Sequence, residues 1–238
     1  RSVQSATYVD EEYRAEPVFD YYLAFDLMFD AKPDIERVLM VGGGGYAYPK
    51  HIIATRPEVH MDVVEIDPAI TRIALTDFYL AEYLSDYPFG GTHDLGRICA
   101  DGCDYLADLS RVVREELGGE GRDSEFARQA RRRYGAGFGQ RYDAMVFDVF
   151  AGKKPVASLA SPTAIRNAHT CLNPGGVLIA NVVSTLEGPK SAFLHQYVEA
   201  LEGEFAHVHV IPLSPDGTDA PDNVILLATD ATWEFAGM

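Results

Sequence analysis

Four consecutive glycines, Gly42, Gly43, Gly44 and Gly45, lie between an apolar run and a helical pattern. Residues without side chains let a ligand approach the backbone closely, and free N–H groups at the start of a helix favour anionic groups. Glu65 ends the next apolar run. An acid about 20 residues after such glycines is placed to accept both ribose hydroxyls of a nucleotide, so we predict a nucleoside site.

A second acid follows the third apolar run. Asp101-Gly102 places a carboxylate where it can approach an adenine amino group. The nicotinamide pattern G-x-G-x-x-G begins at Gly43 and Gly45, but Tyr48 stands at the position of the third glycine. The terminal hairpin predicted below is typical of S-adenosylmethionine-dependent transferases rather than of the dinucleotide fold. The pattern therefore favours S-adenosylmethionine or its decarboxylated form as the co-substrate.

The elements that position these residues alternate between apolar runs and helical patterns, which indicates a doubly wound α/β sheet of the methyltransferase-like (Rossmann-like) class. We predict helices at residues 48–55, 69–78, 161–172 and 189–201. The connection between the last two strands is too short for a crossover helix, so they form an antiparallel hairpin. The seven predicted strands are residues 37–41, 60–66, 97–100, 142–149, 177–183, 205–212 and 223–229.

The chain divides into an N-terminal extension and one larger domain. Residues 1–30 form the extension, with a small strand at 5–9 and an aromatic-rich helix at 18–29. Residues 31–238 form the nucleoside-binding domain. Within it, an insertion at about 109–141 is longer than a usual α/β connection, and it is either a solvated helical insertion or a mobile lid over the site.

Composition excludes several functions. The net charge of −16 argues against a nucleic-acid partner, because phosphates require a basic surface. No apolar run approaches the length of a bilayer span, and no basic segment followed by an apolar one opens the chain. The three cysteines form no disulfide framework, so we expect a cytoplasmic protein. We expect no metal, since His207-x-His209 lacks an evident third ligand.

The ordered set of motifs resembles the spermidine synthase family, the polyamine aminopropyltransferases, over about residues 4–229. The set includes the glycine run described above. The other matching pieces are Gln4, Val64-Glu65-Ile66-Asp67, Ala100-Asp101-Gly102, Tyr142-Asp143 leading to Asp148, Asn173-Pro174-Gly175-Gly176 and Asp222-Asn223-Val224.

The resemblance implies roles for individual residues. Glu65 would hold the ribose, Asp101 the adenine, and Gln4 would reach the nucleoside from the N-terminal segment. Asp148 matches the family's catalytic acid, which takes a proton from the attacking amine while methylthioadenosine leaves. A carboxylate at the mouth of a parallel sheet suits that step, because an ammonium is no nucleophile until it loses a proton. The resemblance also implies a homodimer and a part in polyamine biosynthesis.

The acceptor side is less defined. Tyr21 or Tyr22 falls near a tyrosine that the family uses in its acceptor pocket, although these aromatic residues could equally pack a helix on the sheet. Asn181 and Ser184-Thr185 follow or end the fifth predicted strand, where substrates often line a pocket.

The sequence departs from the family at three anchors for cationic substrates. Gly45 replaces the aspartate of the family's GGGDGG loop, which holds the ammonium of the transferred aminopropyl group. The family's second acid in the acceptor subsite falls on Ala151, and Lys153-Lys154 follow. The tyrosine that usually precedes the last strand has no counterpart in residues 216–222.

Three functions are therefore open. The first is a spermidine-synthase-like transferase that moves an aminopropyl group to an amine. The second is an S-adenosylmethionine-dependent methyltransferase, because the carboxylate of the intact cofactor suits a loop rich in N–H groups. The third is a nucleoside-binding module without catalysis.

Overall fold

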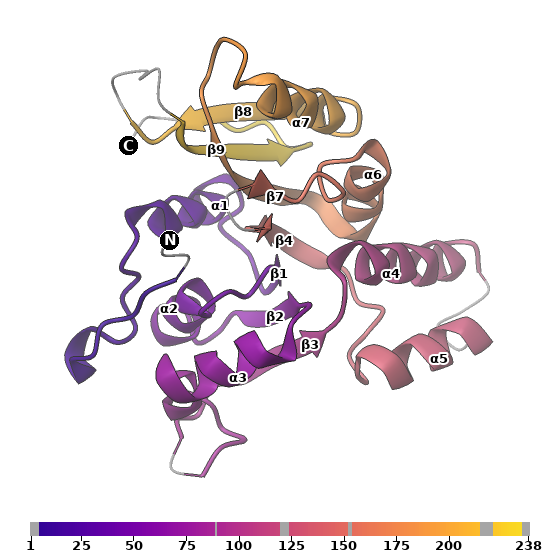
Figure 1. The fold of residues 1–238 in the computed structure, drawn as a ribbon. Helices are drawn as coiled ribbons and strands as arrows, with labels where there is room; N and C mark the ends of the chain where they lie inside the picture. The colour runs from indigo at the N-terminus through magenta and orange to yellow at the C-terminus, as the bar shows by residue number, and fades with distance from the viewer. Residues whose placement is uncertain (1–4, 89, 120–123, 152–153, 215–220, 235–238) are drawn as a thin grey trace.

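Seven strands form one mixed sheet (Figure 1) in the computed structural model, which describes residues 5–88, 90–119, 124–151, 154–214 and 221–234, with only the backbone at 150, 151, 154 and 155. The first five strands in spatial order are parallel, and β9 is antiparallel to both of its neighbours, as predicted. In spatial order the strands are β3 (Leu95–Cys99), β2 (His60–Glu65), β1 (Arg37–Val41), β4 (Tyr142–Phe147), β7 (Leu172–Ser184), β9 (Asp222–Thr229) and β8 (His207–Pro212).

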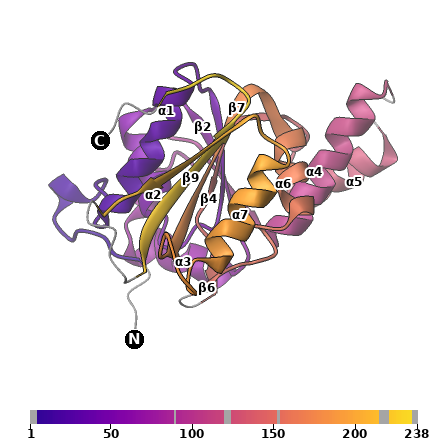
Figure 2. The same cartoon turned by 90° about the horizontal axis from the view of Figure 1, so that it is seen from above.

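Helices cover both faces of this sheet (Figure 2). One face carries η2 (Asp20–Asp26), α1 (Leu27–Ala31), α2 (Ala47–Thr55) and α3 (Pro68–Asp77). The other carries α4 (Gly102–Leu117), α5 (Glu125–Tyr134), α6 (Pro162–Cys171) and α7 (Ala192–Glu202). The remaining short elements are η1 (Glu11–Tyr13), η3 (Leu80–Glu82), and the hairpin of β5 (Phe150–Ala151) and β6 (Lys154–Pro155).

The central strands are apolar because both of their faces are covered. All six residues of β4 are buried, and so are the last four of β1. Such continuous apolar runs are expected when helices pack on both sides of a parallel sheet. The doubly wound, seven-stranded class predicted from the sequence is confirmed.

The N-terminal extension differs from its prediction. Residues 5–9 form no strand, and the helix predicted at 18–29 is the 3-10 helix η2 followed by the five-residue α1. The rings of Tyr21 and Tyr22 stack with centroids 4.2 Å apart, and Tyr22 also stacks on Tyr48 of α2. The 3-10 helix is wound more tightly than an α-helix, and it forms where these rings pack together. Tertiary packing here outweighs the local preference for an α-helix.

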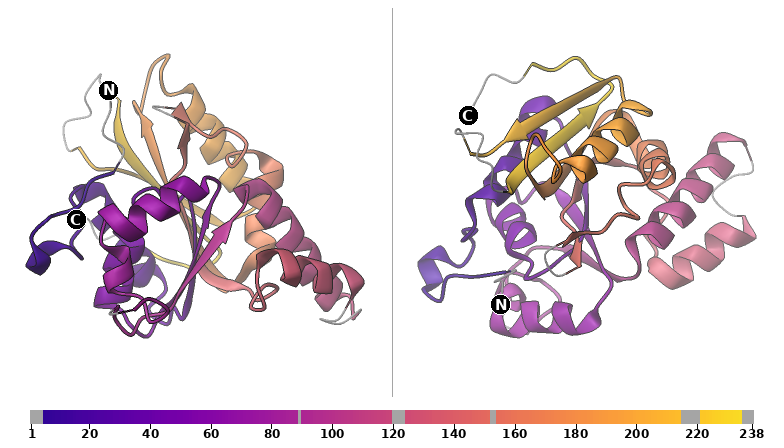
Figure 3. Two further views of the ribbon diagram at one scale, coloured as in Figure 1. Left: turned by 60° about the horizontal axis from the view of Figure 1, so that its bottom comes forward. Right: turned by 45° about the horizontal axis from the view of Figure 1, so that its top comes forward.

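The insertion predicted at about 109–141 contains the end of α4, the whole of α5 and turns where it is described. Helix α4 continues to Leu117, and α5 packs against it through Ala127, Ala130 and Tyr134, which are buried. Figure 3 shows this pair at the periphery of the molecule. The solvated helical interpretation therefore fits these residues.

The start of β1 depends on a buried carboxylate from β4. Asp143 is 9% exposed, and its Oδ2 accepts the backbone N–H groups of Glu36 and Arg37 at 2.9 and 3.0 Å. Its Oδ1 accepts from Asn173 Nδ2 at 2.8 Å. One side chain of β4 thus joins the start of β1 to the start of β7.

We predict that Asp143→Ala lowers the free energy of unfolding by about 3 kcal/mol, because it leaves three donors unpaired at a buried site. Urea denaturation measures the change. The control is Asp34→Ala, which removes a carboxylate that is 82% exposed and pairs with Lys32 at the surface. We expect the control to stay within about 0.5 kcal/mol of the wild type. Equal effects of the two variants would contradict this account of β1.

Candidate functional site

A cavity of about 1010 Å³ opens at the carboxyl ends of the parallel strands. Its walls include the loop after β1, the end of β2, the start of α4, the end of β4 and the last part of β7, together with residues 18–22 from the N-terminal extension. Ligands of open α/β sheets bind at this edge. The volume suits a nucleoside and a small second substrate.

The cavity is acidic. None of its lining residues, as far as the chain is described, is Lys, Arg or His. Carboxylates without compensating cations favour a positively charged ligand. The acidic lining residues are Asp20, Glu65, Asp101, Asp148 and Asp222.

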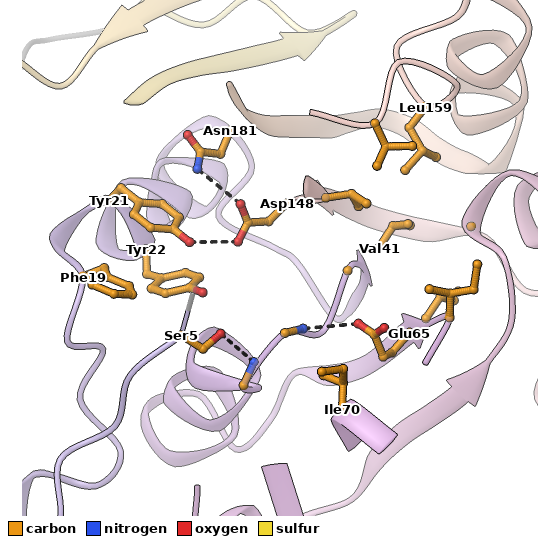
Figure 4. A pocket seen from close by; sticks show the side chains of 18 of the residues that line it. Ser5, Phe19, Tyr21, Tyr22, Val41, Glu65, Ile70, Asp148, Leu159 and Asn181 are labelled. Atoms are coloured by element: carbon orange, nitrogen blue, oxygen red, sulfur yellow. Dashed lines mark hydrogen bonds between the residues drawn. The ribbon is translucent and has the colours of Figure 1, made fainter. Parts of the chain in front are cut away.

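Asp148 follows β4 and is held by two donors (Figure 4). Tyr21 donates its hydroxyl to Oδ2 at 3.0 Å, and Asn181 donates Nδ2 to Oδ1 at 3.2 Å. Burial raises the pKa of Asp148 to about 6, although both hydrogen bonds act in the opposite direction. A carboxyl group with that pKa can both hold and release a proton near neutral pH.

The two tyrosines have different parts. Burial, and then the charge of Asp148, raises the pKa of Tyr21 far above its usual value, so Tyr21 stays a neutral donor. Burial, and then the charge of Asp148, also raises the pKa of Tyr22. Tyr21 therefore contacts the acid directly, while Tyr22 supports it by stacking, and both line the cavity.

Asn181 is a site residue that its position in the sequence marks only weakly. It is 4% exposed and lines the cavity, and within the described structure its Oδ1 has no hydrogen-bond partner. A buried acceptor without a donor is costly. An N–H group of a ligand beside Asp148 would supply that donor.

Glu65 holds the glycine loop. Its Oε2 accepts the N–H groups of Gly43 and Gly44 at 3.0 and 3.3 Å, and its Oε1 accepts from Asp67 N at 2.9 Å. A carboxylate offers about four acceptor positions, so about one is left for a ribose hydroxyl. Glu65 lines the cavity as predicted, and its role toward a ribose stays a prediction.

Asp101 also has a structural role, which its position in the sequence did not predict. Its Oδ1 accepts from Cys103 N and Asp104 N at 2.8 and 3.1 Å, so it caps the start of α4. Both of these bonds are made by one oxygen, while the exposed side chain also lines the cavity. At Gly102 a Cβ atom would lie 2.4 Å from Val41 Cγ1, which explains the glycine there.

A Cβ atom would be too close to its neighbours at three positions of the glycine loop, Gly42, Gly43 and Gly45. Gly42 has φ +93°, and a Cβ atom there would lie 2.4 Å from the backbone oxygen of Asp148. A Cβ atom at Gly45 would lie 2.6 Å from the ring of Phe78 and 2.8 Å from Ser5 Cβ. Phe78 and Ser5 thus occupy the space in which a side chain at position 45 would begin.

Several predicted features lie outside the described residues: Gln4, Lys153, residues 215–220 and the side chains of Ala151 and Lys154. The cavity lining includes no described residue of 109–141, so the lid interpretation of the insertion gains no support. Sequence reasoning missed Ser5 and Phe78, which no local pattern marks.

Two further findings concern the described part of the chain alone. None of its helices is both long and apolar enough to cross a bilayer. It contains no group of three or more His, Cys, Asp or Glu side chains arranged to hold a metal ion.

Comparisons with curated proteins connect the chain to two kinds of transferase. A polyamine aminopropyltransferase of Vibrio vulnificus is 30% identical over 159 residues, which is 67% of this chain and 41% of that protein. The human eEF1A lysine and N-terminal methyltransferase is 28% identical over 194 residues, 75% of this chain and 23% of that protein. The chain thus spans less than half the length of either relative. No protein-family model matches it.

Solved structures show the same fold. A probable spermidine synthase from Corynebacterium glutamicum superposes with a TM-score of 0.65 at 19% identity, over 94% of this chain and 69% of that one. Human methyltransferase-like protein 13 in complex with SAH gives 0.61 at 19% identity, over 89% and 82%. A spermidine synthase with the transition-state analogue AdoDATO gives 0.60 at 12% identity, over 89% and 62%.

The resemblance to the spermidine synthase family is therefore confirmed, and the fold is that of the S-adenosylmethionine-dependent methyltransferases. The similarity of this chain to methyltransferases as well fits a divergent branch of the spermidine-synthase-like proteins. The relatives named for a reaction are transferases.

We predict that Asp148→Asn stabilises the protein at neutral pH. The folded state raises the pKa of Asp148 from 3.8 to about 6, so the stability of the protonated form is fully present below pH 4 and is lost as the pH rises through 6. The amide carries no charge and should gain about 3 kcal/mol over the wild type at pH 8, but little at pH 4. Urea denaturation at the two pH values measures the difference. Asp30→Asn, at an exposed position of α1, is the control.

A gain for Asp148→Asn that is the same at both pH values would contradict a raised pKa of the Asp148 carboxyl group.

Proposed function

We propose that this protein is a transferase that moves an alkyl group from the sulfonium of an S-adenosylmethionine-type nucleoside to the nitrogen of an amine. The observation that carries the proposal is Asp148, a carboxyl group without a cationic partner among the described residues, held in an acidic cavity at the carboxyl edge of the sheet. Both substrates are cations in water, and both suit this lining.

The reaction divides between the chain's own residues. Asp148 accepts a proton from the ammonium of the acceptor, which frees the nitrogen lone pair. Tyr21 and Asn181 hold the carboxylate, and Asn181 Oδ1 is free to accept the second N–H of the amine. The nitrogen then forms a bond to the carbon of the donor, the C–S bond breaks, and its electron pair leaves with sulfur as a neutral thioether. Positioning supplies much of the rate, because the sulfonium is already a good leaving group.

Aminopropyl transfer is the first candidate for the group that moves. The acidic lining suits a donor tail that ends in an ammonium, and the Vibrio relative is named for this reaction. The resemblance further supports a homodimer, a cytoplasmic location and a part in polyamine biosynthesis, and sedimentation would show a dimer directly.

Methyl transfer is the second candidate. Gly45 lacks the carboxylate that the family uses for the aminopropyl ammonium, and Phe78 and Ser5 occupy its space. The eEF1A methyltransferase relative covers more of this chain than the aminopropyltransferase does. A protein-borne amine and a small one are both possible acceptors for this reaction.

Product analysis decides between these candidates. We expect methylthioadenosine from decarboxylated S-adenosylmethionine if the aminopropyl group moves, and S-adenosylhomocysteine from the intact cofactor if the methyl group moves. With either donor, kcat/KM should fall about tenfold per pH unit below pH 6, where Asp148 gains its proton. Mass spectrometry over a panel of diamines and lysine peptides measures both.

Asp148→Asn is the matched variant for this assay. We expect it to lose at least 100-fold in rate while it binds methylthioadenosine as the wild type does, because the nucleoside half of the cavity is unchanged. If the protein binds the nucleoside but forms neither product with any acceptor, it is a binding module without catalysis, and the proposal is overturned.

A further inference from the structure

Every backbone N–H of the glycine loop has a partner within the chain. Glu65 takes those of Gly43 and Gly44, and the last glycine is bound by Ser5, whose Oγ accepts from Gly45 N at 2.9 Å. The other two N–H groups donate to carbonyl oxygens: Gly42 N to Val64 O and Tyr46 N to Gly43 O. The sequence alone predicts a loop rich in free N–H groups, but each of these groups already has an acceptor within the chain.

Ser5 comes from outside the sheet domain. It lies 40 residues before Gly45 and belongs to residues 5–8, which we name the N-terminal segment. Its Cβ atom lies 2.8 Å from the position that a Cβ atom at Gly45 would occupy. Ser5 therefore takes both the N–H and part of the space at this position of the loop.

A buried lysine is hydrogen-bonded to the N-terminal segment. Lys50 of α2 is 1% exposed, and its Nζ donates to Thr7 Oγ1 and to Phe78 O, both at 2.8 Å. One ammonium group thereby holds Phe78 and, through Thr7, the segment that contains Ser5. Burial lowers the pKa of Lys50 to about 8, so it remains mostly charged at neutral pH.

The loop lies where the donor must pass. Strand β1 runs between β2, which ends at Glu65, and β4, which is followed by Asp148. A donor with its ribose at Glu65 and its reacting carbon near Asp148 therefore crosses the loop after β1. The tail of the donor meets the loop on that path, in a cavity whose described lining carries five carboxylates and no basic side chain.

We propose that Ser5 is a specificity-determining residue for the donor, because it occupies the N–H of Gly45 and so disfavours a donor whose tail bears a carboxylate. A carboxylate is normally stabilised by free N–H groups at a helix start or by a cation. Here the N–H groups of the loop are occupied and the described lining carries no basic side chain, whereas a tail that ends only in an ammonium finds acceptors. This inference rests on the proposed function and assigns its donor class: sulfonium nucleosides without a carboxylate.

The test measures three dissociation constants by calorimetry, for S-adenosylmethionine, its decarboxylated form and methylthioadenosine. We expect the wild type to bind the decarboxylated donor more tightly than the intact one. In Ser5→Ala the freed N–H should tighten binding of S-adenosylmethionine roughly tenfold and leave methylthioadenosine within about twofold. Ser5→Thr keeps the hydroxyl and should keep the preference of the wild type.

The outcomes separate the two claims. If the wild type binds none of the three nucleosides, the proposed function fails. If methylthioadenosine binds but Ser5→Ala leaves the ratio between the two donors unchanged, or weakens all three ligands equally, the proposed function stands and the role of Ser5 is overturned.

Discussion

A carboxylate kept inside the protein without a cation to balance it is the constraint around which this site is built. Asp148 is held by one hydroxyl and one amide, which fix its direction but leave its charge uncompensated. Such a group is costly to ionise, and a positively charged ligand relieves that cost. The acidic lining, the neutral Tyr21 and the unpartnered Asn181 oxygen are all consistent with a cavity completed by an amine.

The sheet was predictable because its signal is local. Continuous apolar runs such as the one in β4, followed by turn residues or caps, specify a parallel sheet with both faces covered. The N-terminal extension was not predictable in the same way, because its form depends on rings that pack against α2 and on contacts with the glycine loop. A 3-10 helix and an extended segment have no periodicity that distinguishes them from a helix and a strand.

The candidate site shows the same division. Glu65 and Asp101 follow strand ends at a characteristic spacing, so the sequence places them at the cavity. It does not show that Glu65 already bridges two loop amides or that Asp101 caps α4, because both bonds depend on backbone direction. Ser5 and Phe78 reach Gly45 from distant parts of the chain, and nothing near them in the sequence marks the contact.

The first thirty residues add little to the sheet, yet they form much of one wall of the cavity. Ser5 and Tyr21 both lie there, as does Tyr22. A fragment cut at the beginning of β1 would strip Asp148 of its hydroxyl donor and Gly45 of its acceptor. It would also uncover the sheet face on which Phe25 and Met28 are fully buried. One stretch of the polypeptide thus serves both as a cover of the core and as a wall of the cavity, so a change that loosens its packing would disturb the chemistry as well.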